Sequence, residues 1–64
     1  MSIGTNVRIL RERANITQEE LSKKMGITQS MLSQIEKDIK ALSLIRAKDM
    51  SEILGCSVED ILAE

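Results

Sequence analysis

The chain is 64 residues long, has a net charge of −1, and contains one cysteine, no histidine and no aromatic residue. The length predicts a single domain spanning residues 1–64, and the composition argues against enzyme chemistry, a metal site or a cofactor, because Cys56 has no histidine or second cysteine beside it. The lack of aromatic rings also argues against single-stranded nucleic acid, whose bases stack on such rings.

The charges are unevenly distributed along the sequence. Residues 1–48 carry all nine Lys and Arg residues against five acids, a balance of +4, whereas residues 49–64 carry five acids and no base, a balance of −5. The first part can therefore face a polyanion even though the whole chain is slightly acidic. So small a positive excess implies few phosphate contacts per subunit.

Apolar periodicity and capping residues predict five helices and no strand, hence an all-α fold. The helices should span residues 3–14, 18–25, 29–36, 44–54 and 58–63. Their apolar faces should form one compact core, whose expected members are Ile3, Val7, Leu10, Ala14, Leu21, Met25, Leu32, Ile35, Leu44, Ala47, Met50, Ser51 and Leu54.

The first helix should end at Asn15, which tolerates a left-handed backbone better than most residues. The second helix begins with a capping box, because the Thr17 hydroxyl can accept the backbone N–H of Glu20 while the Glu20 side chain reaches back to Thr17. Gly26 should end that helix in the left-handed conformation. Residues 17–36 therefore encode two short helices joined by a tight turn, an arrangement suited to placing the second helix in a groove.

The third helix has Thr28 as its cap and two chemically different sides. Met31, Leu32 and Ile35 gather on one side. The opposite side carries Gln29, Ser30, Ser33, Gln34 and Lys37. Glutamine can pair with the N6 and N7 edge of adenine, serine can donate or accept, and lysine binds phosphate or guanine. An ordinary solvated face is the alternative, but such faces carry mostly Glu and Lys, whereas the first two turns here are uncharged.

The segment after the third helix contains Asp38, which can end the helix in the left-handed conformation, and further basic residues. Lys37 and Lys40 are candidates for phosphate contacts, with Arg46 a weaker third. Simple solvation of each lysine is the alternative, because surface lysines are common.

The last helix should begin at Ser57, which can form a cap with Asp60. Cys56 is expected to be a small buried residue and not a redox or nucleophilic centre, because no basic cluster surrounds it in the sequence. The apolar residues of this region exceed what so small a core can bury, so it is expected to form an isologous dimer interface. The interface residues would be Ile53, Val58, Ile61 and Leu62.

Taken in order, these residues resemble the helix-turn-helix domains of the phage Cro and repressor type, also called the xenobiotic-response-element family of prokaryotic regulators. The resemblance is carried by Ile3-Gly4, Val7, Leu10-Arg11, Thr17-Gln18-Glu19-Glu20-Leu21, Gly26-Ile27-Thr28-Gln29, Ile35-Glu36, Ser43-Leu44, Leu54-Gly55 and Ser57-Val58. It covers nearly the whole chain and implies a compact five-helix, lambda-repressor-like fold. Many relatives carry a glycine and a proline between the third and fourth helices, which this chain lacks at residues 37–42.

The resemblance implies that the third helix is the recognition helix. The residues it places at base edges are Gln29, Ser30, Ser33 and Gln34. It places Thr28 near a phosphate or a thymine methyl, and Gln18 at the DNA backbone, where Gln18 can also brace Gln29. It further implies an ion pair between Arg11 and Glu36 that joins the first helix to the end of the recognition helix.

These observations predict a sequence-specific regulator of transcription that binds double-stranded DNA, most simply a repressor acting as a homodimer on a near-palindromic operator. The alternative is a protein-binding module such as an antitoxin, in which the same fold neutralises a partner protein. The start of the chain lacks a signal peptide and no apolar run could span a membrane, so a cytoplasmic location with a reduced thiol is expected.

Overall fold

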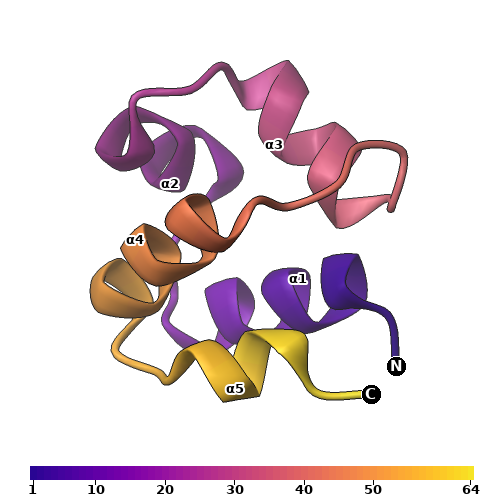
Figure 1. Cartoon of the computed structure of the whole chain (residues 1–64). Coiled ribbons are helices and arrows are strands. Elements are labelled where there is room, and N and C mark those ends of the chain that lie inside the picture. The colour runs from indigo at the N-terminus through magenta and orange to yellow at the C-terminus, as the bar shows by residue number, and fades with distance from the viewer.

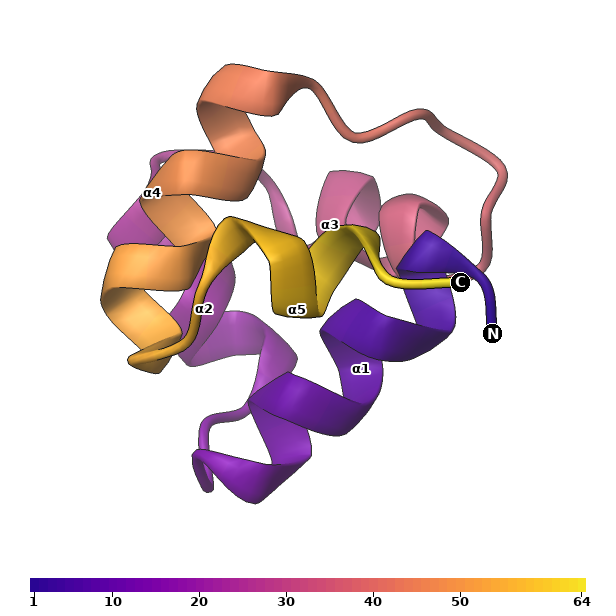
Figure 2. The same cartoon turned by 60° about the horizontal axis from the view of Figure 1, so that its bottom comes forward.

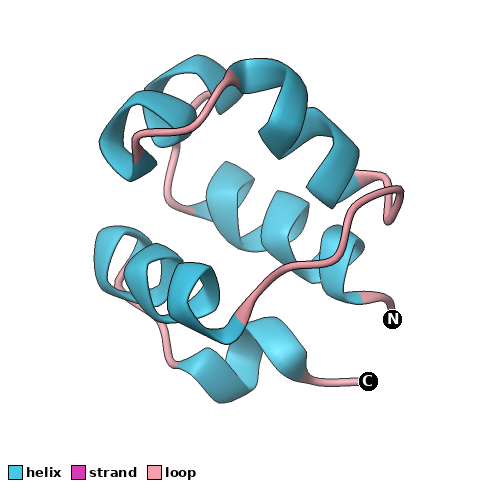
Figure 3. Ribbon diagram, turned by 45° about the horizontal axis from the view of Figure 1, so that its top comes forward, coloured by secondary structure: helices cyan, strands magenta, loops and turns pink.

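The computed structural model describes all residues from 1 to 64 and contains five α-helices and no strand. The helices are α1 (Ile3–Arg13), α2 (Gln18–Met25), α3 (Gln29–Glu36), α4 (Leu44–Leu54) and α5 (Val58–Leu62). These bounds agree with the predicted spans, except that α1 and α5 are each one residue shorter. Figures 1 and 3 show α2 and α3 on one side of α1, and α5 on the other.

The five helices close into a ring. α1 packs on α3 and α5, α2 packs on α3 and α4, and α4 packs on α5, so each helix has two main neighbours. The ring encloses an aliphatic core in which every helix is represented, with zero exposure at Val7, Leu21, Leu32, Ala47, Met50 and Ile61. Leu10, Met25 and Leu54 pack at its margin.

Three residues expected in the core are neither buried nor packed at its margin, namely Ala14, which is half-buried, and Ile3 and Leu44. Ile3 is 37% exposed and Leu44 is 69% exposed. Each is the first residue of its helix. Because side chains of a helix lean toward its N-terminus, Ile3 and Leu44 project past the first turn, where neighbouring residues cover Ile3 only in part and Leu44 little.

Ile61 is more buried than the sequence predicted. The sequence placed it at a dimer interface, but its side chain has no exposed surface and belongs to the core. The face of α5 that carries Ile61 is covered because α5 packs on both α1 and α4. A side chain enclosed within one subunit cannot contact a second, so the interface prediction was wrong for this residue.

The helix ends follow the predicted local chemistry. Every helix begins at a hydroxyl residue whose side chain accepts the backbone N–H three positions later, namely Ser2, Thr17, Thr28, Ser43 and Ser57. The left-handed conformations predicted at Asn15, Gly26 and Asp38 are confirmed, with φ of 59°, 71° and 61°.

Hydrogen bonds from Asn6 connect α5 to α1. Figure 2 shows α5 lying across α1, with the two ends of the chain close together. The buried Asn6 side chain donates its Nδ2 to the carbonyl oxygen of Ile61 at 3.0 Å and also to that of Ala63. These bonds satisfy carbonyl groups at the end of α5 that no further helical turn could reach.

α1 meets the end of α3 at Gly4, with backbone in direct contact. A Cβ atom at this position would lie 2.5 Å from the carbonyl oxygen of Ile35 and 2.6 Å from that of Glu36. Both are backbone atoms and cannot turn away as a flexible side chain could. Glycine is therefore required for α3 to lie this close to α1.

We predict that Gly4→Ala destabilises the protein, although alanine normally favours a helix. The added methyl group has to push α1 away from α3, which should lower the free energy of unfolding by about 1–3 kcal/mol. Urea denaturation followed by circular dichroism measures the effect. Arg8→Ala on the exposed side of α1 is the control and should change stability by about 0.5 kcal/mol or less. Equal stability of Gly4→Ala and the wild type would contradict the close contact.

Candidate nucleic-acid interface

The surface of interest consists of the start of α2, the outer side of α3 and the segment that follows α3 (Figure 1). The turn between the two helices is made at Gly26, where an added Cβ would meet nothing within 4 Å, so glycine is needed there only for its positive φ. Leu21 of α2 and Leu32 and Ile35 of α3 point into the fold and are buried. The polar residues of α3 are left on the outside.

The start of α3 presents exposed, uncharged groups. Thr28, Gln29 and Ser30 are exposed, and Ser33 and Gln34 are half-buried. The Thr28 hydroxyl oxygen accepts the backbone N–H of Met31 at 3.0 Å, which leaves its hydroxyl hydrogen free to donate. The structure therefore brings the expected base-facing residues together on one helix, with the first turn the most accessible.

The two expected phosphate contacts lie beyond the end of α3. Lys37 and Lys40 are exposed and neither forms an ion pair. The segment that carries Lys40 is held against α3, because the backbone N–H groups of Ile39 and Lys40 donate to the carbonyl oxygen of Gln34 at 2.9 and 3.2 Å. The position of Lys40 relative to α3 is therefore fixed by the backbone.

The ion pair implied between α1 and the end of α3 is present. Arg11 Nε lies 2.7 Å from Glu36 Oε2, and Arg11 Nη2 lies 3.2 Å from Glu36 Oε1. The hydrogen bond to Glu36 raises the pKa of Arg11 above its ordinary value, so the guanidinium stays charged over the whole physiological range. Arg11 Nη1 also donates to the carbonyl oxygen of Ile16 at 2.9 Å, which ties in the turn before α2.

Gln18 differs from its expected role in one respect. The resemblance suggested that its side chain can brace Gln29, but the Nε2 group donates to Glu36 Oε1 at 3.0 Å instead. Gln18 is the first residue of α2 and is half-buried. No sequence signal indicated this contact, because the two residues are 18 positions apart and belong to different helices, whose crossing brings them together.

Asp38 has a second role that the sequence did not reveal. Its Oδ1 atom accepts the backbone N–H of Gly4 at 3.0 Å, so the residue that ends α3 also caps the start of α1. Hydrogen bonds from the Ser2 side chain and the Gly4 backbone lower the pKa of the carboxyl group. The one sequence signal for this contact was a glycine within a predicted helix, which usually has a packing reason.

The acids near this surface are already engaged. Glu36 is paired with Arg11, and Asp38 accepts from Gly4. Glu20 accepts the backbone N–H of Thr17 at 3.2 Å, and Glu19 lies 3.3 Å from Lys23 Nζ. The charges of Glu36 and Glu19 are therefore offset by a nearby cation, whereas Asp38 and Glu20 accept from neutral N–H groups and keep their negative charge.

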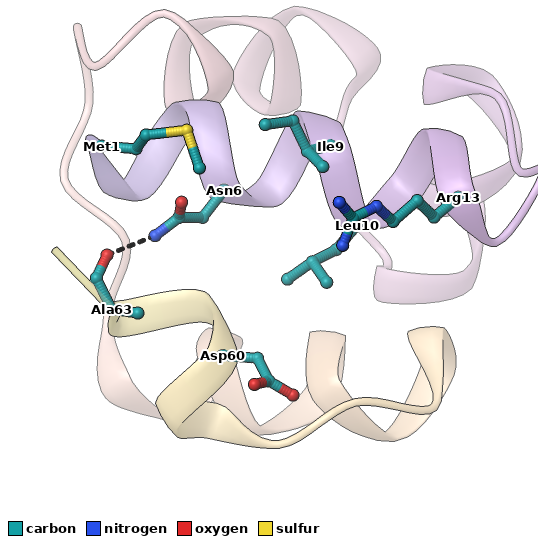
Figure 4. Close-up of a pocket in the computed structure, with 7 residues that line it drawn as sticks. All are labelled: Met1, Asn6, Ile9, Leu10, Arg13, Asp60 and Ala63. Carbon is teal, nitrogen blue, oxygen red and sulfur yellow. Dashed lines mark hydrogen bonds between the residues drawn. The ribbon is translucent and has the colours of Figure 1, made fainter.

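Outside this surface, the structure contains one hollow between α1 and α5 and a single thiol. The hollow between α1 and α5 is lined by Met1, Asn6, Ile9, Leu10, Arg13, Asp60 and Ala63 (Figure 4). Cys56 is half-buried against the core, and burial raises the pKa of its thiol, which favours the unreactive protonated form. No group of three or more His, Cys, Asp or Glu side chains is placed to hold a metal ion, and none of the helices has the length and apolarity to cross a membrane.

Comparison with protein families matches residues 7–61 to the helix-turn-helix family. Comparison with curated protein sequences gives no match. Among solved structures, the P22 c2 repressor bound to a synthetic operator is 25% identical with a TM-score of 0.88, covering 98% of this chain and 96% of that one.

SinR, a master regulator for biofilm formation, provides two further structural matches. In its complex with DNA it is 28% identical with a TM-score of 0.84, covering 92% of this chain and 95% of that one. In a complex of SinR with the protein SinI the match is 30% identical with a TM-score of 0.85, covering 97% of this chain and 61% of that one.

We predict that Asp38→Asn removes part of the pH dependence of stability. The folded-state pKa of Asp38 lies below its ordinary value of 3.8, so the ionised carboxylate stabilises the fold above that value, and this contribution is lost as the pH falls through the folded-state pKa. The stability difference between wild type and variant should be largest near pH 7 and shrink in acid. Asparagine tolerates the left-handed backbone, so φ is not the cause.

Urea denaturation at a series of pH values measures this difference. Asp49→Asn, at an exposed position of α4, is the matched control and should show a smaller effect near pH 7. A wild-type to Asp38→Asn difference that stays constant down to strongly acidic pH would argue against the role of the carboxylate at Gly4.

Proposed function

Since this chain belongs to the helix-turn-helix family of DNA-binding regulators, we propose that it represses transcription by binding a near-palindromic operator as a homodimer. The observation that carries the proposal is the outer side of α3, where exposed amide and hydroxyl groups at Gln29 and Ser30 are flanked by the unpaired charges of Lys37 and Lys40. Similar structures include a repressor bound to operator DNA and SinR bound to DNA.

The geometry of α3 suits the major groove of DNA. An α-helix with its side chains is about 10–12 Å across, and the major groove is about 12 Å wide. Gln29 and Ser30, at the exposed first turn, would reach base edges most deeply, and the half-buried Ser33 and Gln34 would follow one turn later. Glutamine at the first turn favours an A·T pair.

Phosphate contacts would come from the rim of this surface. Lys37 and Lys40 can approach the backbone on one side of the groove, and Gln18 and Thr28 lie at the starts of α2 and α3, where free N–H groups favour anions. Two lysines per subunit contribute only a small electrostatic part of the affinity for DNA. Affinity should therefore depend on joining two subunits on one duplex.

A homodimer is compatible with the size of the domain. The subunit measures 25 × 24 × 20 Å. Two copies side by side can therefore place their α3 helices about 34 Å apart, one turn of the duplex. We propose an interface formed by Leu62, which is 37% exposed, together with the half-buried Ile53 and Val58. Ile61 is excluded because it is enclosed in the core.

Repression is the simplest mode of action for such a domain. Occupying an operator that overlaps a promoter excludes polymerase sterically and needs only the DNA-binding surface. The sign of regulation is tested by fusing the selected operator to a reporter promoter and measuring expression with and without the protein.

A second candidate function is the binding of a partner protein. Ile39, Leu44 and Ile45 are 70%, 69% and 78% exposed and lie along the segment after α3 and the start of α4. The similar SinR structure in complex with SinI shows that a protein of this fold can bind another protein. Affinity capture from the native host separates the candidates: a partner present in equal amount favours this second function, and self-association alone favours the first.

The direct test of DNA binding is selection of bound duplexes from a random pool at low ionic strength. Enrichment of a site with two inverted half-sites about ten base pairs apart is the expected result. Failure to enrich any duplex would refute the proposal.

We predict that Gln29→Ala relaxes selectivity at one base pair of each half-site and weakens binding to the selected site by about 1–3 kcal/mol. Lys40→Ala is the matched comparison: it should weaken all duplexes alike and flatten the dependence of affinity on salt. Fluorescence anisotropy of labelled duplexes measures both effects. If Gln29→Ala left the preference at every operator position unchanged, α3 would not be the reading helix.

We predict that Leu62→Lys shifts the protein from dimer to monomer, because two like charges would meet across a two-fold interface. Ile45→Lys is the control: it replaces an exposed aliphatic residue outside the proposed interface and should leave the dimer intact. Light scattering during gel filtration gives the mass of each variant. A wild-type protein that stays monomeric at concentrations well above those of the cell would eliminate the interface.

A further inference from the structure

The hollow between α1 and α5 is lined along one side by a regular stripe of α1. Its members are Asn6, Ile9, Leu10 and Arg13, at positions i, i+3, i+4 and i+7, so their side chains share one face of the helix. The stripe has a polar amide at one end, a cation at the other end and two apolar residues between them. The hollow has a volume of about 290 Å³, which lies at the small end of the range for ligand sites.

Asn6 contributes one free acceptor to this hollow. It is only 6% exposed, and its Nδ2 group donates to the carbonyl oxygens of Ile61 and Ala63. Both amide hydrogens are thereby used, and because a carbonyl oxygen can only accept, the amide cannot be turned around. The remaining polar atom, Oδ1, has no hydrogen-bond partner in the chain and is not fully enclosed. A ligand that donates a hydrogen bond would satisfy it.

Arg13 and Asp60 bring opposite charges to the hollow from two helices. Arg13 is the last residue of α1, and Asp60 lies on the facing side, in α5 (Figure 4). The two do not pair with each other, and Arg13 has no ion-pair partner elsewhere in the chain. Asp60 accepts the backbone N–H of Ser57 through Oδ2 at 3.1 Å, so its Oδ1 remains free. A free cation, a free carboxylate oxygen and an apolar middle are together complementary to a small zwitterion.

The separation of these groups determines which zwitterion fits. Asn6 and Arg13 lie about 10 Å apart along the helix axis, because each residue of an α-helix rises by about 1.5 Å. Figure 4 shows the Arg13 side chain directed along α1 toward Leu10, which shortens the gap. An α-amino acid carries both charges on one carbon and cannot reach both ends. A linear chain of roughly five carbons can, since each carbon–carbon bond is about 1.5 Å long.

We propose that this hollow binds a linear ω-amino acid, in which an aliphatic chain separates a terminal ammonium from a terminal carboxylate. The carboxylate pairs with the Arg13 guanidinium, and the ammonium donates to Asn6 Oδ1 and to the free oxygen of Asp60. Leu10 packs against the aliphatic chain between the two ends. The site lies apart from the outer side of α3, so the inference goes beyond the proposed function and does not depend on it.

A series of ligands tests the charges and their separation without any change to the protein. The probe is δ-aminovalerate, titrated into the intact chain and followed by the amide signals of α1 and α5 in two-dimensional NMR spectra. We expect saturation with a dissociation constant of about 1 mM or lower. Norvaline is an isomer with both charges on one carbon, valerate lacks the ammonium, and pentylamine lacks the carboxylate. Each of these should bind at least about tenfold more weakly.

Matched variants test the residues. Arg13→Gln and Asp60→Asn each remove one charge from the hollow and should weaken δ-aminovalerate about tenfold or more. Arg8→Gln and Glu59→Gln are the charge-matched controls, at exposed positions of the same two helices outside the hollow, and should leave binding unchanged. The asparagine oxygen can still accept the Ser57 N–H, so the start of α5 is preserved. Circular dichroism checks that each variant is folded.

The outcomes separate this site from the DNA-binding surface. The site is overturned by the absence of saturable shifts with δ-aminovalerate up to about 10 mM, by equal affinity for norvaline, or by equal affinity of the two hollow variants and their controls. None of these results affects the proposed function, because the hollow contains no residue of α2, of α3 or of the segment after α3. A protein that binds δ-aminovalerate but prefers no duplex would retain this site and lose the proposed function.

Discussion

The pairing of Arg11 with the enclosed carboxylate of Glu36 is the interaction on which the DNA-facing architecture depends. It lies where α1, the turn before α2 and the end of α3 meet, and Arg11 bonds to both Glu36 and the carbonyl oxygen of Ile16. Breaking such a pair leaves an uncompensated charge in a poorly solvated place, which is far more costly than loss of a surface pair. The orientation of α3 relative to the rest of the fold therefore involves these polar contacts as well as aliphatic packing.

A chain with a net charge of −1 can still offer a favourable surface to a polyanion. The nearby acids are committed to internal partners: Glu36 to a guanidinium, Asp38 to the start of α1, and Glu20 to the start of α2. Lys37 and Lys40 have no such partners. The field that DNA would meet at this surface thus depends on where the charges lie as well as on their sum over the chain.

Local chemistry allowed most of the fold to be predicted. Helix ends could be located from caps at Thr17 and Ser57 and from left-handed residues at Asn15 and Asp38. These effects depend only on residues a few positions apart in the sequence. Leu44 was expected in the core but is exposed, because a helical wheel shows only the direction of a side chain and not whether a neighbouring helix reaches that end. The bonds from Gln18 to Glu36 and from Asp38 to Gly4 could not be predicted, because they depend on how helices cross.

The attachment of Asn6 to the carbonyl groups of Ile61 and Ala63 joins positions 55 and 57 residues apart. During synthesis the first helix therefore cannot make these contacts until residues 61–63 have left the ribosome. Val7 is in the same situation, because the core around it is closed by Ile61. The domain should consequently acquire its cooperative structure only after release of its last helix, and nascent chains arrested earlier should remain sensitive to protease.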